Sequence, residues 1–224
     1  MSRGVCIRVT ISDDLIREET VRTITNALKA IGDKVLVWFS LPCTGGCPYA
    51  KVNAGKSQKV KQRLGDHLSL FNVLWRAATR LMCSARELGA VIAVEWLTYC
   101  ESWKREEVKY QMAVMSYRFL HLHGCMYGLR STARSIKGRP ITKPWTIATD
   151  CPTLFKYLER RCLAHWHTDE TTGAVIPHAS CSGINAKVTE GYTHEFAIAV
   201  HNGHKDYVSG SHDVAHCMPL PAWN

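Results

Sequence analysis

The sequence lacks any apolar run long enough to cross a membrane, because no stretch approaches 18 uncharged apolar residues. Residues 1–8 contain two arginines and no apolar segment typical of a secretion signal. Cysteine is also too sparse for a small disulfide scaffold, with ten irregularly spaced residues in 224. We therefore expect an intracellular protein, nuclear or cytoplasmic, with reduced cysteines and no membrane partner.

Acidic residues are few: 19 aspartates and glutamates face 28 lysines and arginines, which gives a net charge of +9. This balance favours an anionic partner, most often nucleic acid. The apolar share of 46% and the charged share of 21% exclude disordered, collagen-like and coiled-coil proteins. A chain of this length is expected to form one medium domain, or one domain with a small appendage.

Short apolar runs alternate with longer helical patterns along the chain. The expected strands are 4–11, 34–40, 90–96, 118–123 and 145–149, and the expected helices are 12–31, 64–85, 101–115, 152–158 and 189–201. This order predicts an α/β fold, with a doubly wound, mostly parallel, Rossmann-like sheet that carries helices on both faces. We expect a core over 1–150 and an extension over 151–224, with a small irregular lobe rich in histidine and cysteine.

Cys43 directly follows an apolar strand pattern, in the glycine-containing segment SLPCTGGCP. Cations that follow it include Lys51, Lys56 and Lys59. Nearby cations increase the thiolate fraction of a cysteine, so Cys43 is a candidate nucleophile. The alternative is a loop cysteine without a chemical role.

Glu95 lies at the end of a second apolar run. If the strands are parallel, their carboxyl ends meet at one edge of the sheet, and Cys43 and Glu95 share a site. A helix cap, or an ion pair with Arg105, is the alternative role for Glu95.

Two cysteines and three histidines fall between residues 162 and 181. They are Cys162, His165, His167, His178 and Cys181. Structural zinc takes four nitrogen or sulfur ligands, usually from two closely spaced pairs, so this segment is a candidate zinc site. A solvated loop that contains these residues by chance is the alternative.

Basic residues are concentrated between residues 118 and 161, where nine cations face two acids. Candidate nucleic-acid-binding residues are Arg134, Lys137, Arg139 and Lys143 here, with Lys51, Lys56 and Lys59 in the earlier loop. A basic loop beside strand ends is suited to phosphate contacts. The alternative is a solvated loop.

Pro42-Cys43, Glu95 and Tyr127-Gly128-Leu129, followed by basic residues and a strand, occur in the order found in cytosine-5 DNA methyltransferases. Residues from roughly 5 to 150 resemble the core of that family. The strings SLPCTGGCP, EWLTYCESW and GCMYGLRS also resemble an uncharacterised group of retroelement polyprotein segments.

The methyltransferase resemblance implies roles for individual residues. Cys43 would add to C6 of a flipped-out cytosine, and Glu95 would hold the N3 edge of the base. Arg130 would brace the base, and Asp13 or Asp14 would contact the cofactor S-adenosylmethionine. The family's glycine-rich first motif has no counterpart in this sequence, which implies an incomplete cofactor site.

Two functions are therefore expected. One is a methyltransferase-like domain of the cytosine-5 type that acts on or binds nucleic acid. The other is a non-enzymatic, zinc-stabilised nucleic-acid-binding or structural module of a mobile genetic element.

Overall fold

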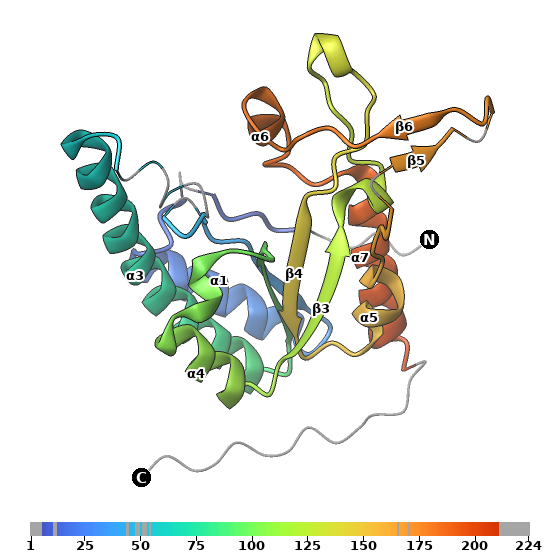
Figure 1. Cartoon of the computed structure of the whole chain (residues 1–224). Helices are drawn as coiled ribbons and strands as arrows, with labels where there is room; N and C mark the ends of the chain where they lie inside the picture. The colour runs from blue at the N-terminus through green and yellow to red at the C-terminus, as the bar shows by residue number, and fades with distance from the viewer. Residues whose placement is uncertain are drawn as a thin grey trace. The chain divides into compact units, whose positions relative to one another are not determined.

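The structure, a computed structural model, describes residues 6–10, 13–43, 45–47, 50, 53, 55–164, 166–169 and 171–210, apart from the side chain of Val188. The chain forms two compact units, Met1–Ile92 and Ala93–Asn224. Figure 1 shows the helices and strands, and each unit is considered by itself below. In the described part of the chain, no helix combines the length and the apolar character needed to cross a membrane.

The first unit contains α1 (Glu18–Ile31), β1 (Leu36–Phe39) and α3 (Gln58–Glu87). α1 has glutamates in its first turn and Lys29 in its last, which complements the helix dipole. It ends at Gly32, whose positive φ of 80° suits glycine at a helix end. These local signals place the end of the helix where the sequence predicts it.

α3 confirms the long helix expected from the apolar spacing. It begins after Ser57, whose side chain accepts a hydrogen bond from the Val60 N–H (3.3 Å). One face is buried, and the rings of Phe71 and Trp75, one turn apart, lie 6.1 Å from each other. The helix ends just before Gly89, which has a φ of 78°.

The second unit contains most of β2 and everything that follows it. Its elements are β2 (Val91–Leu97), η2 (Glu101–Lys104), α4 (Glu106–Val114), β3 (Arg118–His123), η3 (Gly124–Tyr127), η4 (Arg134–Ile136), β4 (Pro144–Thr149), α5 (Thr153–Leu158), β5 (Trp166–Thr168), β6 (Val175–Pro177), α6 (Ile184–Val188) and α7 (His194–Val208). The first two residues of β2 belong to the first unit, where the Val91 N–H donates to Val35 O (3.0 Å).

The expected doubly wound parallel sheet is wrong. The longer strands form a small mixed sheet in the order β1-β2-β4-β3, and β4 is antiparallel to both β2 and β3. β5 and β6 form a separate antiparallel pair. The physical reason lies in the connection from β3 to β4, which holds only the short helices η3 and η4 and no helix long enough for a parallel crossover.

Several local expectations also differ from the structure. The described residues of the expected first strand, 6–10, are not part of a strand, and α1 begins at Glu18 rather than at the cap expected at 12–14. The last helix begins at His194 after Thr193, whose side chain accepts a hydrogen bond from the Phe196 N–H (3.2 Å). β5, β6 and α6 are short elements that the apolar pattern did not predict.

The core of the second unit is aromatic where α7 meets the sheet. The Phe196 ring centroid lies 5.5 Å from those of Tyr127 and Trp145 and 4.9 Å from that of Tyr192. α5 packs against α7 at Gly203, whose carbonyl accepts a hydrogen bond from Thr153 Oγ1 (2.7 Å). Close approach of these two helices therefore depends on a glycine.

Replacing Gly203 by valine is expected to lower the free energy of unfolding by about 1–3 kcal/mol, because it overpacks a buried contact. A Cβ at this position would lie 2.8 Å from Leu154 Cδ2 and 3.4 Å from Leu154 Cα, and Leu154 is fully buried. Urea unfolding followed by circular dichroism measures the change. Gly191→Val is the control, since a Cβ at Gly191 meets nothing within 4 Å; equal stability of the two variants would contradict the packing argument.

Candidate metal centre

Four side chains of the second unit converge from four separate segments. Cys125 lies in η3, Cys162 in the loop after α5, His167 in β5 and His178 just after β6. Their sulfur and ring-nitrogen atoms all lie within 4.8 Å of one another. Cys125 is buried and the other three side chains are half-buried, so this group can hold a metal ion.

Two sulfur–nitrogen distances within the group match those of a tetrahedral centre. Cys162 Sγ lies 3.6 Å from His167 Nε2 and 3.7 Å from His178 Nε2. Bond lengths of about 2.3 Å to sulfur and about 2.0–2.1 Å to nitrogen place a sulfur and a nitrogen about 3.6 Å apart on a tetrahedron. The two imidazole rings are steeply inclined, at 76°, so they approach the shared point from different directions.

His123, the last residue of β3, holds Cys162 in place. His123 Nδ1 lies 2.9 Å from Cys162 N and 3.1 Å from Cys162 O, so it accepts from the N–H when unprotonated and donates to the carbonyl when protonated. Burial lowers the pKa of His123, a hydrogen bond to the Cys162 carbonyl raises it, and the nearby Arg161 lowers it. In both states His123 holds the loop that carries one of the four sulfur and nitrogen atoms.

The two thiols of the group are close enough to influence each other. Burial raises the pKa of Cys125 to about 12, and the charge of Cys162 and a hydrogen bond with it add to the effect. Zinc binds cysteine as thiolate, so a bound metal ion replaces these protons.

The structure brings together part of the expected ligand set. Cys162, His167 and His178 lie in one group, whereas Cys181 Sγ lies against Thr189 Oγ1 (3.4 Å) and is not in the group. His165 lies outside the described residues. Cys125 was missed, because it lies far ahead of Cys162 in the sequence and no spacing rule links the two.

Four of the basic residues that sequence reasoning selected lie on a hairpin over residues 129–141. Arg130 and Pro140 form an antiparallel bridge, and the Ser131 N–H donates to Arg139 O (2.8 Å). The buried Ser131 hydroxyl donates to Asn185 Oδ1 of α6 (2.6 Å), which fixes the hairpin to the C-terminal segment. We call residues 129–141 the basic hairpin. Hydrogen bonds within it and to α6 hold it in a defined conformation.

The exposed charged side chains of the basic hairpin are all cationic. Residues 128–143 contain five cations and no carboxylate. Arg134, Lys137 and Arg139 are exposed and form no ion pair with any residue that the structure describes. Arg130 is also exposed, and its Nη1 donates to Gly138 O within the hairpin (3.0 Å).

Lys143 differs from these residues because it is half-buried. Its ammonium donates to Thr189 O and lies 5.3 Å from the centre of the Trp145 ring. This side chain therefore has a role in packing, and its expected phosphate contact stays a prediction.

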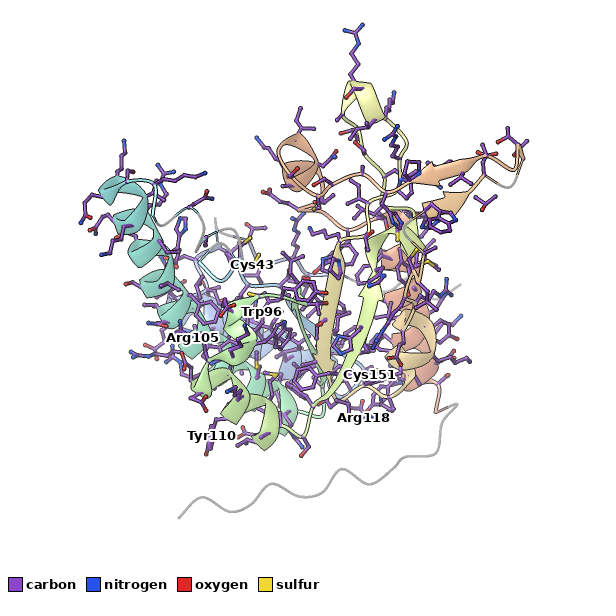
Figure 2. The ribbon with its side chains drawn as sticks, viewed as in Figure 1. Cys43, Trp96, Arg105, Tyr110, Arg118 and Cys151 are labelled. Atoms are coloured by element: carbon purple, nitrogen blue, oxygen red, sulfur yellow. The ribbon has the colours of Figure 1, made fainter. Side chains whose placement is uncertain are left out.

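Cys43 lies in the loop after β1, as expected, and is half-buried (Figure 2). Its carbonyl accepts a hydrogen bond from the Gly46 N–H (2.9 Å). A hollow of about 20 Å³, close to the volume of one water, is lined by Pro42, Gly45, His67, Leu70, Phe71 and Leu74. Lys56 and Lys59 are exposed near the start of α3, and Lys51 lies outside the described residues. The nucleophilic role of Cys43 stays a prediction.

Glu95 lies inside β2 rather than at its end, because the strand continues to Leu97. The side chain is 6% exposed, and Tyr192 OH donates to Glu95 Oε2 (2.6 Å). The strand end expected at Glu95 is therefore wrong by two residues, and the site that Glu95 was expected to share with Cys43 stays a prediction.

The two acids expected to contact a cofactor make local bonds ahead of α1. Asp13 accepts hydrogen bonds from the N–H (2.6 Å) and the hydroxyl (3.0 Å) of Thr10, which lower the pKa of its carboxyl. Asp14 pairs with Arg17 (3.2 Å). Both arrangements stabilise the turn that precedes the helix.

Comparison of this chain with models of protein families, with curated proteins and with solved structures found no match. The candidate metal centre and the basic hairpin therefore have to be interpreted from their own geometry and chemistry.

Proposed function

We propose that the second unit is a zinc-stabilised nucleic-acid-binding module. In this proposal Cys125, Cys162, His167 and His178 hold one Zn²⁺, and the basic hairpin contacts phosphates. The observation that carries it is the set of two thiols and two imidazoles whose ligand atoms lie within 4.8 Å of one another.

The ligand chemistry favours zinc among the common metal ions. Two sulfurs and two imidazole nitrogens in tetrahedral arrangement are the usual donors of structural zinc, whereas magnesium and calcium prefer oxygen. Four protein ligands fill the coordination shell, and a catalytic zinc instead keeps one position open for water. The proposed zinc therefore has a structural role.

The segment around the metal centre needs a stabilising metal ion, because it has almost no apolar core. Among the described side chains of residues 160–191, only Ala179, Asn185 and Thr189 are buried. β5 and β6 have three residues each, and an isolated hairpin of two strands is at best marginally stable in water. A zinc ion supplies the missing free energy of folding directly.

Nucleic acid is the ligand that the basic hairpin fits best. Its exposed cations lie on a hairpin that is anchored by backbone and side-chain hydrogen bonds. The hairpin therefore keeps these cations together at the surface. Phosphate contacts by lysine and arginine supply most sequence-independent affinity for nucleic acid. The overall charge of +9 acts in the same direction.

Methyltransferase chemistry does not form part of this proposal. No hydrogen bond or contact of Cys43 or Glu95 described above points to a base or a cofactor. It stays a prediction from the resemblance of the sequence.

The test uses the full chain expressed with added zinc. We expect one zinc per chain by elemental analysis, and we expect a chelator to lower the melting temperature and to abolish binding of a fluorescent oligonucleotide. Renewed addition of zinc should restore both. A chain without zinc, or one equally stable after chelation, would contradict the metal centre; a zinc-loaded chain that binds no oligonucleotide at low salt would contradict the nucleic-acid role alone.

A further inference from the structure

The outer face of the β5-β6 hairpin exposes apolar side chains. Trp166 is 50% exposed and Val175 is 65% exposed. Trp166 pairs with Pro177 and Thr168 pairs with Val175 across the two strands, and all four side chains are exposed. An indole exposed on a strand of three residues is a costly surface for a protein to leave in water.

The opposite face of the same hairpin faces the metal centre. Side chains alternate along a strand, so His167, between Trp166 and Thr168, lies on the other face and belongs to the metal-binding group. Coordination of His167 would therefore fix Trp166 in its outward position. The metal centre and the exposed indole thus lie on opposite faces of the same hairpin, and the first orients the second.

The exposed indole and the basic hairpin belong to the same part of the second unit. The Ala179 N–H, two residues after β6, donates to Pro140 O at the base of the basic hairpin (2.8 Å). Hydrogen bonds with Thr172 and Thr171 lower the pKa of Asp169, which follows β5, and the charge of Arg130 adds a smaller effect in the same direction. Figure 1 shows the two hairpins projecting from the same end of the sheet formed by β3 and β4.

We propose that Trp166 stacks on unpaired bases, so that the ligand of the second unit is single-stranded nucleic acid. This inference rests on the proposed function, since it takes the phosphate contacts of the basic hairpin as given. Cations that follow a backbone, combined with an exposed aromatic ring, are the two components of sequence-tolerant binding to single strands. In a duplex the base faces are stacked on one another and cannot reach the indole.

A nucleic acid fits this surface better than an apolar protein partner. The four exposed cations of the basic hairpin would remain unpaired against an apolar partner, whereas a single strand supplies phosphates for them and base faces for Trp166. Charge complementarity therefore favours a nucleic acid over an apolar protein as the ligand of this surface.

The test compares three ligands by fluorescence anisotropy with the zinc-loaded full chain: an unpaired oligonucleotide, the same sequence as a duplex, and a strand of equal length with abasic sites. Trp166→Ala is expected to weaken binding of the unpaired strand about 5- to 150-fold, the range that stacking of one base supplies. It should leave binding of the abasic strand unchanged, because that strand keeps the phosphates and lacks the bases. Trp166→Phe, which keeps a ring, should retain most of the affinity.

Tyr99→Ala is the matched control, since Tyr99 is a 68% exposed aromatic residue outside the two hairpins. Zinc content of one ion per chain shows that each variant has kept its metal centre. If the wild type binds none of the three ligands, the proposed function itself fails. If the wild type binds but Trp166→Ala binds the unpaired strand equally well, or the duplex binds as tightly as the unpaired strand, the nucleic-acid role stands and the stacking inference is overturned.

Discussion

Replacing Cys162 by serine is expected to remove stoichiometric zinc from the full chain and to unfold the segment that contains β5 and β6. Cys162 Sγ lies near both histidine nitrogens of the group, so its loss opens the centre of the site. A structural zinc site contributes about 10–16 kcal/mol, and one ligand in four corresponds to about 2.5–4 kcal/mol, or about a 10²- to 10³-fold loss of zinc affinity. Competition with a chromophoric chelator measures this affinity.

Cys181→Ser provides the control for that experiment. Cys181 is a half-buried cysteine of the same segment, but its sulfur contacts Thr189 Oγ1 instead of the metal-binding group. We expect this variant to keep one zinc per chain with unchanged affinity. Equal loss of zinc in both variants, or retention of zinc in Cys162→Ser, would exclude the four-residue centre described above.

Removing two cations from the basic hairpin is expected to reduce the salt dependence of nucleic-acid binding. In Arg134→Ala/Lys137→Ala, the slope of log K against log salt should fall by about 1.4 for a single strand, because each phosphate contact contributes about 0.7. The affinity at low salt should fall similarly for all sequences. Titrations at several salt concentrations give the slope directly.

Lys104→Ala/Lys109→Ala has the same change of net charge and serves as the control. These two lysines are exposed but pair with Glu101 (2.9 Å) and Glu106 (2.7 Å), so they already have carboxylate partners. Their removal should leave the slope unchanged. A similar decrease in both variants would mean that the affinity depends on overall charge, and the basic hairpin would lose its specific role.

The helices and strands that the sequence predicted well are those with strong apolar patterns. α3 repeats apolar residues every three or four positions and ends before Gly89, and β4 is buried at every position from Trp145 to Thr149. Such patterns show which side chains are buried and at what period. Burial of those side chains is what stabilises the helix or the strand.

Strand direction was not accessible from the same patterns, because a strand buried on both faces looks alike in parallel and antiparallel sheets. The useful signal was the connection between β3 and β4, which carries no helical periodicity and so favours neighbouring antiparallel strands. β5 and β6 are too short to show alternation, and the hydrogen bond from the Ala179 N–H to Pro140 O joins the segment after β6 to residues far from it in the sequence.

The candidate metal centre was predicted where its residues are close in sequence. Cys162 and His167 lie five residues apart, a spacing that suggests shared ligation. Cys125 joins them only because β3 and η3 carry it there, and Glu95 meets Tyr192 only because α7 packs near the sheet. Contacts of this kind are set by tertiary packing, which no local pattern encodes.

The wide separation of Cys125 and His178 determines when the metal centre can be completed during synthesis. Cys125 leaves the ribosome about fifty residues before His178, a delay of about 3–10 s at typical rates of translation. Over that interval the chain carries Cys125 without the complete set of residues that form the candidate metal centre. All four of these residues can therefore come together only after residue 178 has been synthesised, and a chain that stops earlier lacks at least one of them.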